Sequence, residues 1–312
     1  MKAVIAHEFG GPEVLIYEDS PEPSPSKGQV LIEVHGSSIN PVDKMSISKN
    51  SSFKNMIKLP LTPGVDVSGV IIDVGSDVKD LKVGDKVYGQ AGALQKGTGA
   101  FAEFAVAPIN VLARMPENIS FKEAAALPLA SVSAYQALVQ HMNLQKGQKI
   151  LIQGGSGGIG SFAIQLARYL GAYVATTSTG PGMEYARKQG AHEVIDYMHQ
   201  SFENILQDFD AVLDTVGGDT YKKSFKVLKK DGMIVSMLEA PDEELMKKYG
   251  VRAVQQLTAV NKESLDKVSA LIKKNVFKVN IAKTFPLKDT KEAFKAKEDE
   301  MILGKIAIEV RD

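Results

Sequence analysis

Short runs of β-branched and aromatic residues, separated by turn-forming residues, fill the first third of the chain. The runs span residues 30–34, 69–74, 86–88 and 101–107. Glycine and proline cluster between them, at residues 24–28, 83–85 and 97–99. Strands this short and this closely spaced are typical of a compact, partly closed β-barrel rather than of alternating strand–helix units.

From about Ser120 the pattern changes to helices and then to alternating strands and helices. Helices are expected at residues 121–127 and 133–142, followed by strands at 149–153, 173–177, 193–196, 210–214 and 232–236. Further helices are expected between these strands, at residues 158–170, 183–189, 200–206 and 220–228. This alternation of mostly apolar strands with helices predicts a parallel sheet covered on both faces.

The last third predicts an amphipathic helix over residues 262–274, in which Leu265, Val268, Leu271 and Ile272 form one apolar stripe. A strand at residues 279–285, a helix at 288–297 and a final strand at 305–310 are expected after it.

Charge and cysteine content narrow the classes of function. Lys plus Arg and Asp plus Glu each number 37, so no global field would attract nucleic acid or an anionic membrane. The chain has no cysteine, which rules out disulfides, a catalytic thiol and thiolate zinc sites. No stretch is long and apolar enough to span a membrane or to act as a signal peptide, so a cytoplasmic location is expected.

A glycine-rich segment follows the first strand of the parallel sheet. Its residues are Gly155, Ser156, Gly157, Gly158, Ile159 and Gly160, which fit the pattern G-x-G-x-x-G between an apolar strand and an amphipathic helix. Such glycines permit a tight turn that brings the backbone close to a pyrophosphate at the positive end of the helix. Residues 145–237 therefore predict a Rossmann-type dinucleotide-binding domain, and a methyltransferase-like domain with a similar turn is the alternative.

The end of the second parallel strand carries hydroxyls instead of a carboxylate. NAD-specific domains usually place an acid about 20 residues after the glycine turn, to hold the ribose hydroxyls. Here residues 175–180 contain none, and Ser178 and Thr179 are the candidates for contact with a ribose 2′-phosphate. This favours NADP, although Thr176–Thr179 would equally serve to end a strand.

Several motifs, in order along the chain, resemble one family. They are residues 10–15 (GGPEVL), 38–43 (SINPVD), 63–70 (PGVDVSGV), 83–88 (VGDKVY), 124–138, the glycine turn, 190–197 (GAHEVIDY) and 304–306 (GKI). Together they are similar to the zinc-independent quinone oxidoreductase and enone reductase branch of the medium-chain dehydrogenase/reductase family.

This resemblance implies an α/β architecture with two domains. A GroES-like β-barrel-type catalytic domain would comprise residues 1–120 and 266–312, the latter being a C-terminal return that completes it. A Rossmann doubly wound parallel-sheet domain would comprise residues 121–265. The active site would lie in the cleft between them, and the family implies a homodimer.

Two positions argue against zinc. In the zinc-dependent alcohol dehydrogenase branch, a cysteine and the histidine of a Gly-His-Glu segment are metal ligands. The matching positions here are Asn40 and, within Gly64-Val65-Asp66, Val65, which cannot ligate a metal. No metal site is expected.

The resemblance implies roles for residues near the start of the chain. Asn40 and Asp43 match an active-site turn that lies close to the nicotinamide and the substrate. Both residue types also form ordinary turns. Lys44 is a candidate donor to a developing oxyanion, although many relatives carry the basic residue one position later, where this chain has Met45.

It also implies contacts to the cofactor. Ser133 matches a threonine that contacts the nicotinamide end, with a helix N-cap hydroxyl as the alternative role. Tyr197 would border the adenosine phosphate, and Thr215, Val216 and Gly217 would approach the nicotinamide ribose from the end of the fourth strand. Many NADPH-using relatives have a lysine at the position of Gly182, whereas no basic residue occurs here between Tyr169 and Tyr185.

The function implied is transfer of hydride from NADPH to a quinone or an α,β-unsaturated carbonyl without zinc. Alternatives are an enoyl-thioester reductase of the same architecture and a protein that binds or senses NADPH without turnover.

Overall fold

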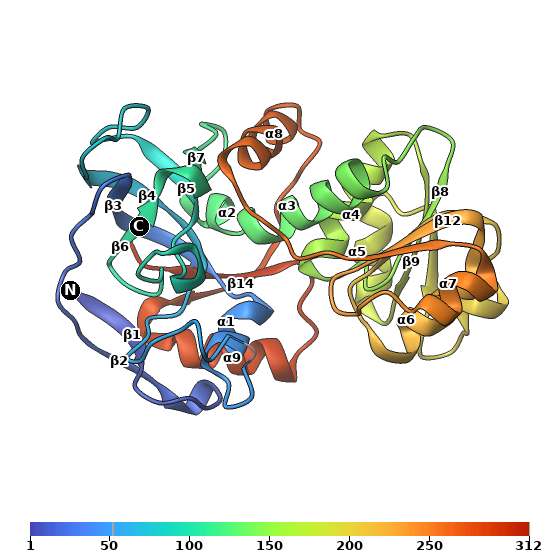
Figure 1. Cartoon of the computed structure of the whole chain (residues 1–312), viewed down its shortest axis with the longest axis horizontal. Coiled ribbons are helices and arrows are strands. Elements are labelled where there is room, and N and C mark those ends of the chain that lie inside the picture. The colour runs from blue at the N-terminus through green and yellow to red at the C-terminus, as the bar shows by residue number, and fades with distance from the viewer. Residues whose placement is uncertain (52, 312) are drawn as a thin grey trace. The chain divides into compact units, whose positions relative to one another are not determined.

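A computed structural model of the chain describes residues 1–51 and 53–311 and divides them into two compact units (Figure 1). Unit 1 contains residues 1–129, 260–273 and the chain from Val279 onward, and unit 2 contains Ala130–Ala259 and Lys274–Lys278. The sequence predicted domain boundaries at 120/121 and 265/266. Residues 121–129 and 260–265 instead lie in unit 1, and residues 274–278 lie in unit 2. The Ser68 hydroxyl donates to the Phe121 carbonyl at 2.6 Å, which fixes the start of this segment to unit 1.

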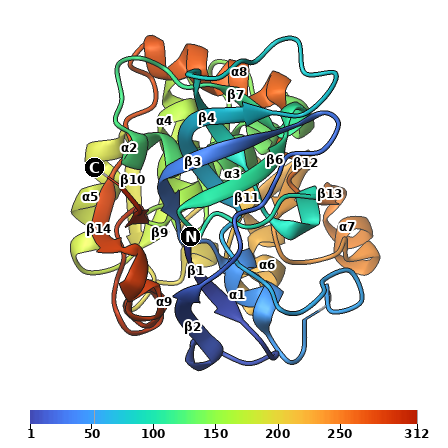
Figure 2. The ribbon, with the colours of Figure 1, turned by 90° about the vertical axis from the view of Figure 1, so that its left-hand side faces the viewer.

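Unit 1 is built on a mostly antiparallel sheet in the order β14-β15-β3-β4-β5-β7, with β6 paired to β3. Figure 2 shows β3, β4 and β6 side by side, and β1 and β2 form a separate two-stranded sheet. The strands are β1 Lys2–Ala6, β2 Leu15–Asp19, β3 Gln29–Ser38, β4 Asp66–Val74, β5 Lys86–Gln90, β6 Phe104–Pro108, β7 Leu112–Arg114, β14 Ile281–Pro286 and β15 Lys305–Glu309. β15 pairs antiparallel with the end of β3, which brings the C-terminal segment beside the turn after Ser38.

Four α-helices complete the described part of unit 1: α1 Pro41–Ile47, α2 Phe121–Ala125, α8 Lys262–Lys273 and α9 Thr290–Asp299. Short 3-10 turns connect the elements at Pro12–Val14, Ala93–Gln95, Ile109–Val111 and Leu287–Asp289. The amphipathic helix predicted at 262–274 is α8, with Leu265 and Val268 fully buried. The Tyr88 hydroxyl donates to the Leu265 carbonyl at 2.6 Å, which ties α8 to β5.

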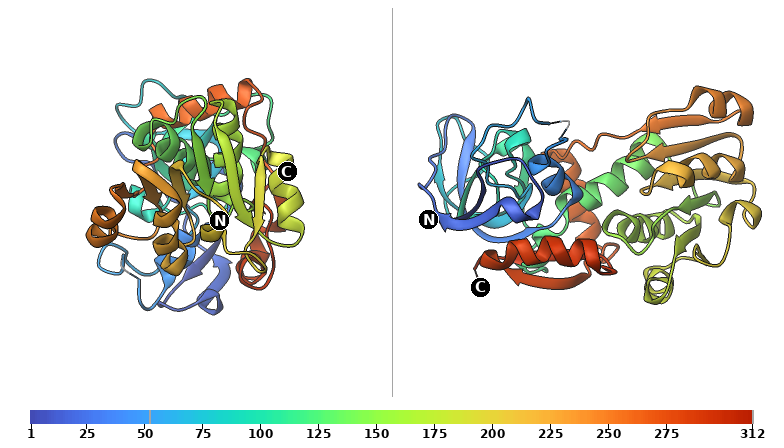
Figure 3. Two further views of the ribbon diagram at one scale, coloured as in Figure 1. Left: turned by 90° about the vertical axis from the view of Figure 1, so that its right-hand side faces the viewer. Right: turned by 90° about the horizontal axis from the view of Figure 1, so that it is seen from below.

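Unit 2 contains a six-stranded, fully parallel sheet in the order β10-β9-β8-β11-β12-β13. The strands are β8 Lys149–Ile152, β9 Tyr173–Ser178, β10 Glu193–Asp196, β11 Phe209–Asp214, β12 Leu228–Ser236 and β13 Arg252–Gln255. Counted from β8, this is the order 3-2-1-4-5-6 of the Rossmann fold, whose switch point lies between β8 and β11. The left view of Figure 3 shows the green to yellow strands of this sheet side by side.

The helices of unit 2 are α3 Pro128–Tyr135, which begins at the unit boundary, α4 Gly158–Tyr169, α5 Pro181–Gln189, α6 Gly218–Ser224 and α7 Glu243–Tyr249. α3 continues into a π-helical turn at Gln136–His141, and a 3-10 turn at Phe225–Val227 follows α6. The helix predicted at 200–206 is wrong, because only Phe202–Asn204 forms a 3-10 turn. Gln200 instead closes the loop after β10, accepting a hydrogen bond from the Asp196 amide at 3.2 Å.

Each unit has its own apolar core. In unit 1, Phe101 and Phe294 lie in one buried cluster and Ile32 and Leu112 in another. In unit 2, Leu151, Val212 and Ile234 from adjacent parallel strands are fully buried. Among the described residues, no helix has both the length and the apolar character needed to cross a membrane.

Candidate functional site

The glycine turn of unit 2 joins β8 to α4 at the carboxyl edge of the sheet. Two of its glycines are required by the protein itself. A Cβ on Gly155 would lie 2.1 Å from Thr176 Oγ1, and a Cβ on Gly160 would lie 2.3 Å from the Gly154 carbonyl oxygen. Both distances are too short for any side chain, so these glycines let the turn pack against β9 and let α4 start close to the strand.

Gly157, which caps α4, is not required by the packing of the protein. Its φ of −78° is open to any residue, and a Cβ there would meet nothing nearer than 3.4 Å. The protein therefore has room for a side chain at this position. The first N–H groups of a helix have no partner within the helix, so a glycine here leaves the backbone open to an anion at the N-terminus of α4.

The hydroxyls expected near a ribose phosphate are brought together beside this turn. Ser178 Oγ lies 3.1 Å from Ser156 Oγ, and Gly182 packs against both, since a Cβ on it would lie 2.4 Å from Ser178 Oγ. Thr179 bonds through its side chain to Asp196, where the His199 ring also lies 2.9 Å away. The hydrogen bond from His199 contributes most to lowering the pKa of Asp196, and Thr179 contributes next.

Tyr197 is 54% exposed next to these residues, and its amide donates to the Ser178 carbonyl at 3.3 Å. Its ring is free to face a ligand. The first basic side chains after this strand, Arg187 and Lys188, lie in the last turn of α5.

The turn after β11 is fixed by the side chain of Asp214 and consists of Thr215, Val216 and Gly217. The buried Asp214 carboxylate accepts from the amides of Val216 and Gly217, each at 3.0 Å, and from Ser236 Oγ at 2.7 Å. The Thr215 hydroxyl donates to the Gln153 carbonyl at 2.8 Å. Hydrogen bonds to Asp214 and Gln153 therefore fix the conformation of this turn, and Val216 is half exposed.

Ser133 lies within α3, not at its start, so the alternative role of N-cap is wrong. Its buried hydroxyl lies 2.8 Å from Thr258 Oγ1. Gln256 Nε2 also donates to the Ser133 carbonyl at 3.1 Å, and Gln136 bonds to both the amide and the carbonyl of Ala259. Segment 256–259 is thus fastened along α3.

In unit 1, Asn40 precedes α1 and has no polar group left free. Its side chain is 3% exposed. Its Oδ1 accepts from Lys305 Nζ at 2.5 Å, and its Nδ2 donates to Asp66 Oδ2 at 2.9 Å. Asn40 is positioned inside the fold and does not present its amide to solvent.

Asp43 is the third residue of α1 and is 1% exposed. Its Oδ2 accepts from the Asn40 amide at 2.8 Å, and its Oδ1 accepts from the amides of Gly64 and Val65 at 3.2 and 2.9 Å. The carboxyl therefore joins the start of α1 to the segment that matches the metal-binding loop of the zinc-dependent branch. Gly64, with φ of +96°, lies against Phe101 and has no room for a Cβ.

Burial dominates the ionisation of this cluster. Loss of hydration raises the pKa of Asp43 to about 7, although the Asn40 and Val65 amides favour the ionised form. Burial likewise raises the pKa of Asp66, against the stabilising charge of Lys305, and lowers the pKa of Lys305.

Lys44 faces away from this cluster. Its ammonium group forms an ion pair with Glu298 of α9 at 2.6 Å, and both side chains are close to half exposed. Of the three candidate catalytic residues, Asn40 and Asp43 are therefore brought together by a backbone hydrogen bond, and Lys44 is not part of their contacts.

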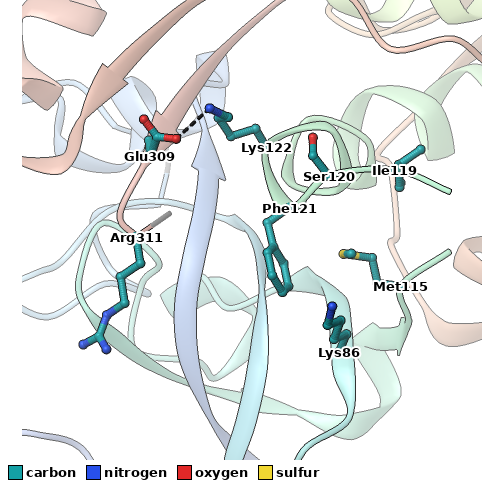
Figure 4. A pocket seen from close by; sticks show the side chains of 8 residues that line it. All are labelled: Lys86, Met115, Ile119, Ser120, Phe121, Lys122, Glu309 and Arg311. Atoms are coloured by element: carbon teal, nitrogen blue, oxygen red, sulfur yellow. Dashed lines mark hydrogen bonds and ion pairs between the residues drawn. The ribbon is translucent and has the colours of Figure 1, made fainter. Parts of the chain in front are cut away.

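Two hollows of unit 1 differ in character. A cavity of about 10 Å³ lies beside Asp43 and Ser46 and is otherwise lined by Val42, Ile57 and residues of segments 61–65 and 92–94. The other, about 330 Å³, is shown in Figure 4 and contains no predicted site residue. There the Lys86 ammonium lies over the Phe121 ring, and Lys122 pairs with Glu309 at 2.6 Å.

Three residues of these clusters were not predicted as site residues: Asp66, Lys305 and Asp214. Asp66 and Lys305 lie inside motifs that carried the resemblance, but nothing in the sequence places them together. In residues 1–51 and 53–311, no group of three or more His, Cys, Asp or Glu side chains could hold a metal ion.

A parallel sheet of this order, with a glycine turn at its switch point and a separate β-rich unit, defines a dinucleotide-dependent oxidoreductase class. Comparisons with known proteins agree. Residues 26–117 match the family model described as alcohol dehydrogenase GroES-like domain, and residues 189–308 match the one described as zinc-binding dehydrogenase.

The chain is 40% identical over 248 residues to 2-methylene-furan-3-one reductase of Solanum lycopersicum, covering 77% of this chain and 63% of that protein. It is 35% identical to the NADPH-dependent alkenal/one oxidoreductase of Arabidopsis thaliana, covering 99% of this chain and 79% of the relative. The solved quinone oxidoreductase of Coxiella burnetii matches with a TM-score of 0.92 and 34% identity, covering 100% of this chain and 99% of that one.

This chain belongs to the medium-chain dehydrogenase/reductase family, in its zinc-independent quinone and enone reductase branch. The predicted combination of a GroES-like domain with a Rossmann domain is confirmed.

Proposed function

We propose that the protein is an NADPH-dependent, zinc-independent oxidoreductase that transfers hydride to quinones or α,β-unsaturated carbonyls. One observation carries the proposal: an intact dinucleotide turn in unit 2 accompanies a unit 1 whose metal-ligand positions hold Asn40 and Val65. The names of the relatives, alkenal/one and quinone oxidoreductases, support the same class of substrate.

The residues of unit 2 fit a dinucleotide. Gly157 leaves space where a Cβ would be tolerated by the protein, which suits a pyrophosphate at the N-terminus of α4. Ser156 and Ser178 would serve the adenosine ribose and its phosphate, Tyr197 the adenosine side, and Thr215–Gly217 with Ser133 the nicotinamide half. NADPH is proposed as the donor on the name of the Arabidopsis relative and on the absence of a carboxylate at residues 175–180.

Bound NADPH would supply the hydride. The protein's own contribution is to hold donor and acceptor in line and to limit water around them. The turn at Thr215–Gly217, held by Asp214, would position the nicotinamide ribose. Segment 256–259, bonded to α3, would hold Ser133 in place beside the nicotinamide. Because Asn40 and Asp43 are saturated with hydrogen bonds inside unit 1, we assign them to shaping the acceptor site through the turn before α1.

Acceptors of this class need no metal. A quinone or an enone accepts hydride at carbon while negative charge develops on a conjugated oxygen, so hydrogen-bond donors and positive potential are sufficient to stabilise it. A simple ketone lacks this conjugation and is the acceptor that a bound zinc ion would polarise.

The test is NADPH consumption, followed by its absorbance, with a panel of quinones, alkenals, cyclic enones, enoyl-thioesters and simple ketones. Turnover with quinones or enones and none with ketones is expected. Turnover confined to enoyl-thioesters would favour the alternative reductase. Tight NADPH binding without oxidation by any acceptor would favour a binding or sensing protein and defeat the proposal.

We also propose a homodimer in the cytoplasm. β13 is the last strand in the order of the described sheet, and Leu257 just after it is 84% exposed. Unpaired strand edges readily pair with another chain. Sedimentation at several concentrations tests this, and a monomer throughout would refute the dimer.

A further inference from the structure

Three residues far apart in the sequence form a buried network in unit 1. Asn40 lies between Lys305 and Asp66, with its oxygen 2.5 Å from Lys305 Nζ and its nitrogen 2.9 Å from Asp66 Oδ2. Lys305 Nζ also donates to the Ile39 carbonyl at 3.2 Å and lies 4.0 Å from Asp66 Oδ2. All three side chains are 5% exposed or less.

The two charged partners fix the orientation of the Asn40 amide. An ammonium group only donates hydrogen bonds and a carboxylate only accepts them, so the amide oxygen must face Lys305 and its NH₂ group must face Asp66. Turning the amide over would set two donors against each other and two acceptors against each other.

The remaining bonds of Asp66 leave it no freedom either. Its Oδ1 accepts from Gln90 Nε2 at 3.3 Å and from the Leu129 amide at 3.1 Å, and its Oδ2 also accepts from Ser38 Oγ at 3.2 Å. The network therefore joins the starts of β4 and β15 to the end of β3, directly before α1.

A buried ion pair adds little to stability by itself, because desolvation offsets most of the attraction. Three buried ionisable groups in one place, with Asp43 hydrogen-bonded to Asn40, are therefore hard to explain by stability alone. Their position is informative: Asn40 occupies the place of a metal ligand in the zinc-dependent branch, and Lys305 sets a positive charge against it.

We propose that Lys305 is a positioning residue of the reductase site: it holds the Asn40 amide in one orientation and keeps a positive charge behind the turn that begins α1. The inference rests on the proposed function. The charge acts through Asn40 on the negative charge that develops on the acceptor's oxygen, in a region where burial limits screening.

The orientation is tested by exchanging two isosteric side chains. Asn40→Asp alone would place two carboxylates against each other, and Asp66→Asn alone would leave Lys305 without its carboxylate. The double variant Asn40→Asp/Asp66→Asn restores one carboxylate beside Lys305, and the amide introduced on β4 can donate to the carboxylate introduced before α1. We expect each single variant to lower the melting temperature by roughly 5 °C or more, and the double variant to recover most of that loss. Additive losses would overturn the inference.

The positioning role is tested by replacing the lysine. We expect Lys305→Met to lower kcat with a good acceptor by about tenfold or more, with little change in KM or in the dissociation constant of NADPH measured by fluorescence. Lys305→Arg, which keeps the charge, should recover part of kcat. The matched control is Lys283→Met on β14, which removes an exposed lysine paired with Glu300.

The pH profile separates charge from structure. Burial and the nearby Lys297 of α9 lower the pKa of Lys305, while Asp66 of β4 and Asp43 of α1 raise it, and the net direction is downward. The wild-type kcat should therefore fall at alkaline pH as Lys305 loses its proton, and this fall should move to higher pH in Lys305→Arg, whose guanidinium stays charged.

The outcomes are distinguishable from failure of the proposed function. A Lys305→Met variant with the kcat and pH profile of the wild-type enzyme would overturn the inference and leave the reductase intact. A wild-type protein that oxidises no NADPH with any acceptor would defeat the proposed function, and the exchange of Asn40 and Asp66 would still decide whether the network orients the amide.

Discussion

The glycine turn of unit 2 and the Asn40 turn of unit 1 are both connections that follow a strand and begin a helix, yet they are built in opposite ways. The glycine turn exposes backbone. It leads into α4, which begins at Gly158, and the glycine before it, Gly157, leaves open a space that a Cβ could occupy. The Asn40 turn is made of side chains: every polar atom of Asn40 and Asp43 is hydrogen-bonded inside the fold.

The roles proposed for the two turns would account for this difference. A pyrophosphate is common to all dinucleotides, so a site built from backbone amides suits it and needs few specific side chains. Acceptor molecules vary in shape. A site for them benefits from a fixed framework, because the residues that contact the acceptor can then differ between related enzymes without disturbing the turn. Buried charge provides that stiffness here, because breaking any single bond would leave a charged or polar group unpaired.

The largest effect is expected when a side chain is added inside the glycine turn. Gly160→Ala would set a Cβ 2.3 Å from a backbone oxygen. We expect it to destabilise the protein by about 3 kcal/mol or more, or to prevent folding, as measured by urea denaturation.

Gly157→Ala is the matched control in the same turn. We expect a melting temperature near that of the wild type and NADPH binding weakened by about tenfold, because the methyl group would occupy space meant for the ligand. Equal stability losses at Gly157 and Gly160 would show that both are structural. Unchanged NADPH binding in Gly157→Ala would contradict the proposed pyrophosphate site.

The buried Asp43 of the Asn40 turn should make the free energy of unfolding depend on pH. The pKa of Asp43 is about 7 in the folded protein and near its ordinary 3.8 when unfolded, so between these values the folded state keeps a proton that the unfolded chain has lost. The resulting stabilisation is present below pH 3.8 and is lost as pH rises through 7. From pH 5 to 7 we expect a loss of about 2 kcal/mol, measured from urea midpoints. Asp43→Asn should flatten this slope, and an equal slope in the variant would contradict the assignment.

A smaller effect is expected where α3 of unit 2 contacts segment 256–259. Ser133→Ala removes the 2.8 Å contact with Thr258. We expect a loss of about 1 kcal/mol in stability and a rise in the KM for NADPH of a few fold, from steady-state kinetics. Ser131→Ala, two residues earlier in the same helix, provides a comparison, and a KM that rises equally in both would indicate a general loosening of α3.

The smallest effect is expected at Lys44. Because its ion pair with Glu298 is solvent-exposed, Lys44→Ala should change stability by less than about 0.5 kcal/mol and kcat by less than twofold. Glu298→Ala should behave alike. A large loss of kcat in Lys44→Ala alone would restore Lys44 as a donor to the oxyanion.

The dinucleotide unit could be predicted almost entirely from sequence, because its signals are local. Each strand reads as an apolar run, and the glycine turn follows one of them directly. Predictions failed where local propensity competed with loop geometry. Residues 200–206 have helical character, but the Gln200 side chain accepts a hydrogen bond from the Asp196 amide and the segment forms a loop. Two further elements of unit 2, β13 and α7, were not predicted.

The support of the Asn40 turn could not be predicted in this way. Asn40 and Lys305 meet across 265 residues of sequence, and a lone lysine in a C-terminal strand gives no signal that it is buried. Resemblance alone identified Asn40 and Asp43, and it assigned roles without showing that both side chains are fully engaged. Register between β15 and β3 decides the contact, and that register becomes visible only in three dimensions.

The pairing of β15 with β3 also sets an order of events during synthesis. Asn40 and Asp66 leave the ribosome before any residue of unit 2, and Lys305 emerges only after the whole of unit 2. Until then the nascent β-rich unit holds a carboxylate whose cationic partner does not yet exist, while the parallel sheet has all its strands and can fold first. A chain that stops before Lys305 would therefore carry a complete unit 2 and a unit 1 in which β3 lacks its β15 neighbour.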